Sequence, residues 1–256
     1  MGRAPEYAFL DWPTPIAFSH RGDATHAPEN TMLAFEAAVD LGYRYVETDV
    51  HATRDGLLVA FHNRSLDDVT DARGMIERLP WEYVARARVA GREPIPLLED
   101  LLGTWPELRV NIDPKSDAAV EPLIDAIRRC GAIDRVCIGS FRERRQIRAR
   151  AALGEQLCTS MGPVAAVRLS ASSFGFPAGR PVAPCAQLPA RPGGLAFVNA
   201  RLIGTAHRRG IKVHAWTVDA EAEIHGLLDI GVDGIMTDRP TALRDVLAER
   251  GQWTPA

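Results

Sequence analysis

The sequence has little of what marks a secreted, membrane-spanning or disulfide-stabilised protein. It contains four cysteines among 256 residues, and none of them stand in a C-x-x-C pair. We therefore expect free thiols in a reducing compartment, with neither a metal-binding nor a nucleophilic role. No apolar stretch is long enough to span a bilayer, and residues 1–15 lack the continuous apolar core of a secretory signal.

Neither positive nor negative charge is in large excess. The formal net charge of −3 offers no general attraction to nucleic acid or to an anionic membrane. With 46% hydrophobic residues, the chain can bury a large core. We expect a cytoplasmic protein whose partner is a small molecule, without an integral membrane segment or a nucleic-acid partner. The sequence leaves the oligomeric state open.

Strand-like and helix-like patterns alternate along the chain. Strands are predicted at residues 16–19, 45–50, 108–112, 136–140, 156–160, 182–188, 211–218 and 234–237. Helices are predicted at residues 117–130, 143–153, 200–209, 220–230 and 241–250, and a further helix starts after Asn30-Thr31. Eight such strands favour a TIM (β/α)8 barrel. An open doubly wound sheet is the alternative, although no glycine-rich turn follows the first strand.

Two segments interrupt the alternation. The turn Thr53-Arg54-Asp55-Gly56 leads into an extra strand at 57–61, which we expect to pair back on the second strand. Residues 63–96 then form a small insertion with a short helix near 80–88, and residues 170–194 are rich in Pro, Gly, Ser and Ala. Neither segment is large enough for a separate domain, so residues 1–256 are predicted to be one domain. Either segment could shape a pocket.

Charged side chains gather where the predicted strands end. His20 and Arg21 follow the first strand, at the catalytic rim of a parallel barrel. Glu47 and Asp49 are two residues apart, so they point to the same face of the second strand. Such a pair needs a cation, a basic partner or water. An ion pair with Arg44 is the structural alternative to a metal site.

A third carboxylate and a second imidazole extend this set. Asp113 follows the strand at 108–112, and Lys115 comes two residues later. Three acidic oxygen donors from neighbouring strand ends suit Mg²⁺ or Ca²⁺. His62 ends the extra strand. Carboxylates for a cation, a guanidinium for phosphate oxygens and imidazoles for proton transfer together indicate metal-assisted attack on a phosphate ester.

The ordered motifs resemble the glycerophosphodiester phosphodiesterase family over residues 16–247. The segments that carry this resemblance are His20-Arg21-Gly22, Pro28-Glu29-Asn30-Thr31, Glu47-Thr48-Asp49-Val50, Thr53-Arg54-Asp55-Gly56, His62, Ile95-Pro96-Leu97-Leu98-Glu99, Asn111-Ile112-Asp113-Pro114-Lys115, Ser140-Phe141, Trp216-Thr217-Val218-Asp219, Gly231-Val232-Asp233-Gly234 and Thr237-Asp238-Arg239-Pro240. His-Arg-Gly alone is a weak signal, whereas the series is specific.

The resemblance implies a TIM barrel that hydrolyses glycerophosphodiesters to glycerol phosphate and an alcohol. It implies one divalent cation, Mg²⁺ or Ca²⁺, and a small-molecule substrate, either a glycerophosphodiester or a lysophospholipid. The implied roles are cation binding for Glu47, Asp49 and Asp113, acid–base catalysis for His20 and His62, phosphate binding for Arg21 and Lys115, support of the first-strand site for Glu29, and a pocket wall for Trp216.

Two positions depart from the family pattern. Asp113 stands where the family usually has Glu, and Asn63 follows the second histidine where the family usually has Asp. A neutral amide at 63 gives less support to a protonated His62. Two other functions stay open. One is a lysophospholipase D-like enzyme, or a lyase that forms a cyclic phosphate from lysolipids, for which Phe174, Phe176 and Leu195 could provide apolar surface. The other is a non-catalytic phosphodiester-binding barrel.

Overall fold

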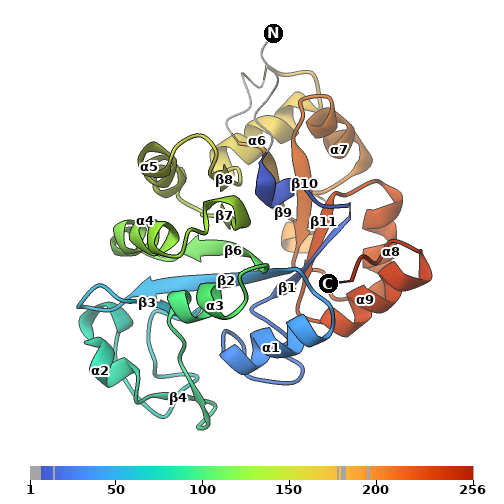
Figure 1. Cartoon of the computed structure of the whole chain (residues 1–256). Helices are drawn as coiled ribbons and strands as arrows, with labels where there is room; N and C mark the ends of the chain where they lie inside the picture. The colour runs from blue at the N-terminus through green and yellow to red at the C-terminus, as the bar shows by residue number, and fades with distance from the viewer. Residues whose placement is uncertain (1–6, 14, 178, 180–182, 195–196, 256) are drawn as a thin grey trace.

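The computed structural model describes residues 7–13, 15–177, 179, 183–194 and 197–255 (Figure 1). In these residues eight parallel strands follow one another around a barrel in the order β8-β7-β6-β2-β1-β11-β10-β9. They are β1 (Ile16–His20), β2 (Tyr45–Ala52), β6 (Arg109–Pro114), β7 (Val136–Ile138), β8 (Cys158–Thr159), β9 (Cys185–Pro189), β10 (Lys212–Trp216) and β11 (Gly234–Thr237). A single parallel bridge between Ser160 and Cys185 joins β8 to β9, so the sheet closes as the predicted TIM barrel.

The strand register brings the predicted polar residues to one end of the barrel. His20 of β1 lies level with Glu47 of β2, and Asp49 lies level with Asp113 of β6. Because neighbouring parallel strands end at the same edge, side chains that are far apart in the sequence become neighbours there. Residue 182 of the predicted strand 182–188 lies outside the described residues.

Helices cover the outside of the barrel (Figure 1). They are α1 (Met32–Asp40), α3 (Leu98–Thr104), α4 (Val120–Arg129), α5 (Glu143–Leu153), α6 (Pro163–Ser172), α7 (Ala200–His207), α8 (Glu221–Asp229) and α9 (Pro240–Glu249). Thr31 caps α1, because its hydroxyl oxygen accepts a hydrogen bond from the Ala34 amide at 3.2 Å. The main apolar core fills the space between these helices and the sheet. No helix in the described ranges has the length and apolar character needed to cross a bilayer.

The extra strand and the insertion follow the prediction in outline. β3 (Leu58–Ala60) pairs antiparallel with β2. Between β3 and α3 the chain forms a 3-10 turn η2 (Ile76–Arg78), helix α2 (Trp81–Val84) and a hairpin of β4 (Arg88–Val89) and β5 (Glu93–Pro94). A small apolar cluster around Ile76 stabilises this insertion. The hairpin was not predicted, since each of its strands has only two residues.

One helix was missed by the sequence prediction. α6 occupies residues that had no assignment and the first three residues of the stretch predicted to be irregular, 170–194. Its start carries a proline in the first turn, a position that tolerates the missing amide hydrogen. Val164 and Val167 on α6 are exposed, so the apolar spacing that would indicate a buried helix face is blurred. The rest of that stretch contains β9.

A short N-terminal turn closes the barrel at the amino ends of its strands, opposite to the polar residues. In η1 (Ala8–Leu10), Phe9 is buried inside the barrel together with Phe18 and Tyr45. The Tyr45 hydroxyl donates a hydrogen bond to the Phe9 carbonyl at 2.7 Å. The amino-terminal end of the barrel is therefore filled by an aromatic core, and a pocket opens at the strand C-termini.

Candidate active site

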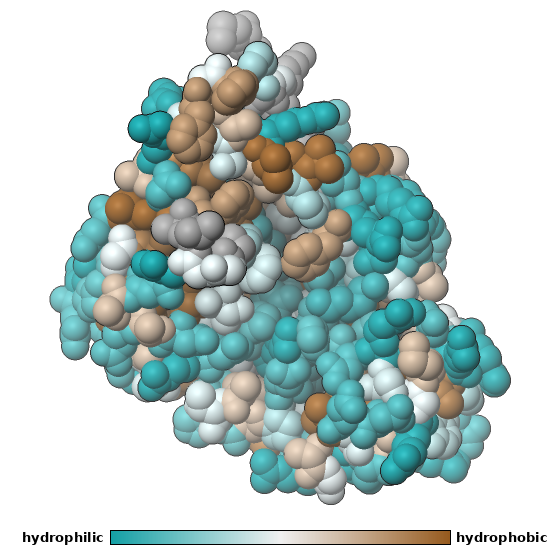
Figure 2. All heavy atoms as spheres, turned by 180° about the vertical axis from the view of Figure 1, so that it is seen from behind, coloured by the Kyte–Doolittle hydropathy of each residue, from teal (hydrophilic) through white to brown (hydrophobic). Residues whose placement is uncertain are grey.

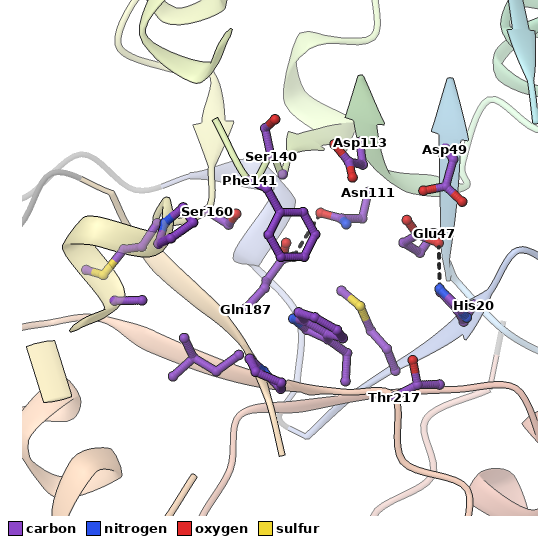
Figure 3. A pocket seen from close by; sticks show the side chains of 18 of the residues that line it. His20, Glu47, Asp49, Asn111, Asp113, Ser140, Phe141, Ser160, Gln187 and Thr217 are labelled. Atoms are coloured by element: carbon purple, nitrogen blue, oxygen red, sulfur yellow. Dashed lines mark hydrogen bonds and ion pairs between the residues drawn. The ribbon is translucent and has the colours of Figure 1, made fainter. Parts of the chain in front are cut away.

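A pocket of about 510 Å³ opens at the carboxyl ends of the strands (Figure 3). Its lining consists of a charged wall, an apolar wall and a polar, uncharged floor. The charged and imidazole groups of one wall are His20, Arg21, Glu47, Asp49, His62, Asp113 and Lys115. The opposite wall consists of Phe141, Met161, Pro163, Ala166, Val167, Leu188, Phe197 and Trp216. Eight of the nine predicted site residues therefore line one pocket, and the ninth, Glu29, lies behind Arg21.

The His-Arg-Gly motif forms a tight turn at the end of β1. Gly22 has a φ of +81°, and a Cβ at this position would lie 2.6 Å from the Ala34 carbonyl carbon, so helix α1 leaves room only for glycine. Arg21 also has a positive φ, 58°. Its Nη1 donates to both carboxylate oxygens of Glu29 at 3.0 Å. This contact supports the predicted role of Glu29, which is to hold the first-strand site in place.

Asp49 is the most strongly paired carboxylate of the site. It is 2% exposed. Its Oδ1 lies 2.5 Å from Lys115 Nζ, and its Oδ2 lies 2.9 Å from Arg21 Nε. Lys115 Nζ also lies 3.0 Å from Asp113 Oδ2. Burial raises the pKa of Asp113, and the neighbouring Lys115 charge opposes that rise. Lys115 thus neutralises two of the three carboxylates.

Among the described residues, Glu47 forms no ion pair with a lysine or arginine, and its ion-pair partner is His20. It is 5% exposed, and its Oε2 has no hydrogen-bond partner among the described residues. Burial, and next the charge of Asp49, raise the pKa of Glu47 to about 8. An unpartnered buried carboxylate oxygen beside a second carboxylate fits a divalent cation, which prefers oxygen ligands. The ligand oxygens of Glu47, Asp49 and Asp113 do not all lie within 4.8 Å of one another, and Lys115 is ion-paired to both aspartates.

His20 lies between two carboxylates. Its Nδ1 is 2.6 Å from Asp238 Oδ1. Its Nε2 is 3.5 Å from Glu47 Oε2, the contact that is dashed in Figure 3. Burial alone would lower the pKa of His20, but Glu47 and the hydrogen bond to Asp238 outweigh it, so this pKa is raised. The surroundings therefore favour the protonated imidazole. The sequence prediction gave Asp238 no role, although its place directly after β11 was a usable signal.

His62 has a different partner. Its Nδ1 lies 2.9 Å from the side-chain oxygen of Asn63. An amide oxygen can only accept, so Nδ1 carries the hydrogen and Nε2 keeps its lone pair in the neutral ring. Behind it, His51 Nε2 lies 3.1 Å from the His62 carbonyl oxygen and steadies the backbone there. Asn63, noted as a departure from the family, thus selects the tautomer that can accept a proton.

The floor of the pocket is polar and uncharged. Gln187 of β9 donates a hydrogen bond to the Asn111 side-chain oxygen of β6 at 2.8 Å, across the barrel (Figure 3). Gly139 and Ser160 line the same floor. Asn111 lies two residues before Asp113 on β6 and so shares its face. The sequence prediction did not assign these residues to the site, because an amide pair across the barrel leaves no local pattern.

Several large apolar side chains of the apolar wall are exposed to solvent. Phe141 is 66% exposed and packs edge-on against Trp216, with ring centroids 5.9 Å apart. Val167 on α6 is 63% exposed. Apolar surface also gathers over the upper part of the molecule, around α6 and α7, in Figure 2. Of the three residues predicted to offer apolar surface near the site, Phe174 and Phe176 are exposed, and Leu195 lies outside the described residues.

The fold and the pocket are those of a TIM-barrel enzyme with its site at the strand C-termini. Comparison with known proteins agrees with this class. The model of the glycerophosphoryl diester phosphodiesterase family matches residues 20–242. The chain is 43% identical to a Mycobacterium tuberculosis protein described as "Probable glycerophosphodiester phosphodiesterase 2", over 100% of this chain and 99% of the relative. It is 26% identical to the human lysophospholipase D GDPD1, over 90% of this chain and 85% of that protein.

Solved structures share the fold. A glycerophosphodiester phosphodiesterase from Agrobacterium tumefaciens superposes with a TM-score of 0.73 at 22% identity, covering 89% of this chain and 98% of that one. An Oleispira antarctica phosphodiesterase, solved with its product sn-glycerol-3-phosphate, superposes with a TM-score of 0.76 at 21% identity, covering 92% and 97%. The chain belongs to the glycerophosphoryl diester phosphodiesterase family and is an enzyme of that class.

Proposed function

We propose that the protein hydrolyses glycerophosphodiesters to glycerol phosphate and a free alcohol, by acid–base catalysis of two histidines with the help of one divalent cation. The observation that carries the proposal is the contrast between the two imidazoles of the pocket. His20 faces two carboxylates, which favour its protonated form, and His62 Nδ1 faces an amide oxygen, so Nε2 is the nitrogen that can accept a proton when the ring is neutral. One acid and one base in one pocket are what cleavage of an ester requires.

The cation would be held by Glu47, Asp49 and Asp113, and oxygen donors suit Mg²⁺ or Ca²⁺. What supports this is the unpartnered buried oxygen of Glu47 beside Asp49. When bound, such an ion supplies Lewis-acid stabilisation of the negative charge that develops on the phosphoryl oxygens.

The protein's own groups then carry the proton transfers. Arg21 and Lys115 orient the two non-bridging phosphate oxygens and offset their charge. His62 Nε2 takes the proton of the nucleophile, either a water or the glycerol hydroxyl of the substrate. The nucleophile's oxygen bonds to phosphorus as the bond to the leaving alcohol breaks, and His20 Nε2 gives its proton to that alcohol. With water as the nucleophile, this step yields glycerol phosphate directly. With the glycerol hydroxyl, it yields a cyclic phosphate, which a water then opens to glycerol phosphate. Asp238 is hydrogen-bonded to the other ring nitrogen of His20, Nδ1, and so keeps the ring in place.

A panel of glycerophosphodiesters with choline, ethanolamine, glycerol and inositol head groups, each assayed with Mg²⁺, Ca²⁺ and Mn²⁺, tests the proposal. We expect release of glycerol phosphate that stops in chelator and returns when the ion is restored. Full activity in chelator would contradict the role of the carboxylates. Tight substrate binding without turnover under every metal would instead support the non-catalytic binding barrel.

A second candidate substrate class, lysophospholipids, is favoured by the apolar wall. Trp216, Phe141 and Val167 offer an acyl chain a surface beside the charged wall. The relative named human lysophospholipase D GDPD1 supports this alternative. Adding lysophospholipids to the panel tests it, and phosphorus NMR of the product separates a cyclic phosphate, formed by a lyase, from an acyclic monoester.

The proposal includes a cytoplasmic location, because the cysteine pattern is that of free thiols in a reducing compartment.

A further inference from the structure

Below the floor of the pocket, three cysteines share one layer of the barrel interior. Cys137 lies on β7, Cys158 on β8 and Cys185 on β9, and all three are buried. Each stands two residues before a member of the pocket floor, which places it on the same face of its strand, one layer nearer the amino end. Those floor residues are Gly139, Ser160 and Gln187. The fourth cysteine, Cys130, follows helix α4 on the outside and is not part of this layer.

The three sulfur atoms are spaced for a shared ligand. All three lie within 4.8 Å of one another, and Cys137 Sγ is 4.0 Å from Cys185 Sγ. Sulfurs bound to one zinc at about 2.3 Å stand roughly 3.7 to 4.0 Å apart, depending on whether the geometry is tetrahedral or trigonal. A disulfide would need about 2.05 Å. Among the described residues, no other group of three His, Cys, Asp or Glu ligand atoms is as compact.

A buried histidine adds a second, independent observation. His214 of β10 is 0% exposed, and neither of its ring nitrogens has a hydrogen-bond partner among the described residues. Burial lowers the pKa of His214, and the charge of the neighbouring Cys185 opposes this. A buried imidazole without partners is costly unless something binds it. Neutral imidazole is the usual nitrogen ligand of zinc.

The cluster also sits where the barrel is joined most weakly. β8 has two residues and β7 has three. In the described residues one backbone bridge, between Ser160 and Cys185, joins β8 to β9, and beside it Cys185 Sγ donates a hydrogen bond to the Thr159 carbonyl at 3.7 Å. A metal that is bound by β7, β8 and β9 together would fasten this seam. The layer is closed from below, because η1 packs against β8. Closed sites of cysteine and histidine are structural rather than catalytic.

We propose that Cys137, Cys158 and Cys185 bind one Zn²⁺ as thiolates, with His214 as the fourth ligand once its ring turns toward Cys185. Binding exchanges three thiol protons for the ion, and the protons pass to solvent, so four neutral side chains and Zn²⁺ become a site of net charge −1. This site is separate from the carboxylate pocket, which takes harder cations. The proposal does not depend on the reaction that the enzyme catalyses.

The experiment uses the full chain, refolded in reductant with one equivalent of Cd²⁺ as the spectroscopic substitute for Zn²⁺ and an excess of Mg²⁺ to occupy the carboxylates. Thiolate bound to Cd²⁺ gives an ultraviolet charge-transfer band that carboxylates do not give. We expect this band at one ion per chain in the wild type and in the matched control Cys130→Ser. We expect its loss in Cys137→Ser, Cys158→Ser and Cys185→Ser. Its absence from the wild type, or its persistence in these three variants, would overturn the proposal.

A second measurement needs no variant and so does not depend on whether the serine variants fold. X-ray absorption at the zinc edge of the wild-type chain, refolded with one equivalent of Zn²⁺ and excess Mg²⁺, counts the donor atoms. Three sulfurs and one nitrogen support the site as proposed, and any other shell overturns it. The zinc-loaded wild type should also unfold at a higher temperature than the metal-free protein.

Discussion

The two walls of the pocket differ in how firmly their side chains are held. On the charged wall, Asp49 is fixed by Arg21 and Lys115, and His20 is fixed by Asp238. On the apolar wall, Phe141 and Val167 are more than half exposed and make few fixed contacts. The charged wall is therefore preorganised for one reaction, whereas the apolar wall can accept alcohols of different size. Under the proposed function, the charged wall would carry out the chemistry and the apolar wall would select the leaving group.

The largest effect should come from the imidazoles of the charged wall. Replacement His20→Ala or His62→Ala removes a proton-transfer group, so we expect each to lower kcat by at least on the order of 10²-fold. Turnover of a glycerophosphodiester at saturating substrate measures this. His225→Ala, on α8 outside the pocket, is the matched control. If both pocket variants kept wild-type rates, the acid–base assignment would be wrong.

The next effect concerns the metal affinity of the same wall. Glu47→Gln replaces a pocket carboxylate whose buried Oε2 accepts no hydrogen bond and which, unlike Asp49, is not ion-paired to a lysine or arginine among the described residues. We expect the activating concentration of Mg²⁺ to rise at least about 10-fold. A metal titration of activity measures it. Glu36→Gln, at an exposed position of α1, is the control. An unchanged titration for Glu47→Gln would mean that the cation lies elsewhere.

The apolar wall should change substrate preference without changing the chemistry. Val167→Asp puts a charge into the pocket wall, so we expect kcat/KM for a lysophospholipid to fall about 10-fold, equivalent to ~1.4 kcal/mol of lost apolar contact. The value for a small glycerophosphodiester should stay the same. Val164→Asp is closely matched, since Val164 is 54% exposed on the same helix but does not line the pocket. An equal fall in kcat/KM for both substrates would contradict the separate roles of the charged and the apolar wall.

The smallest effect is a shift in pH dependence. Asp238 is one of the carboxylates that raise the pKa of His20, and a general acid loses activity as pH rises through its pKa. Asp238→Asn should therefore move the alkaline limb of kcat/KM to lower pH, with a few-fold loss near neutrality. The pH profile of Asp245→Asn, an exposed position of α9, serves as the reference. A limb that does not move would mean that His20 is not the acid.

Much of the charged wall could be predicted because strand ends are local features. An apolar run followed by His20 or by Asp113, and the two-residue spacing of Glu47 and Asp49, identify residues of one barrel rim. Glu143–Leu153 and Gly234–Thr237 have the predicted bounds for the same reason. The apolar wall was largely missed. α6 exposes Val164 and Val167, of which Val167 lines the pocket, so its pattern does not indicate a helix with a buried face.

The sequence by itself determined the alternation of strands and helices, the order of the motifs and therefore the family. Those features depend on periodicity and on residue types at strand ends, which are read along the chain. Only the tertiary structure determined which side chains contact one another in the site. It set Asp238 against His20, Asn63 against His62 and Gln187 against Asn111. It also gathered three cysteines without any metal-binding spacing into one sulfur layer, because the register of three separate strands, and not their separation in sequence, sets those distances.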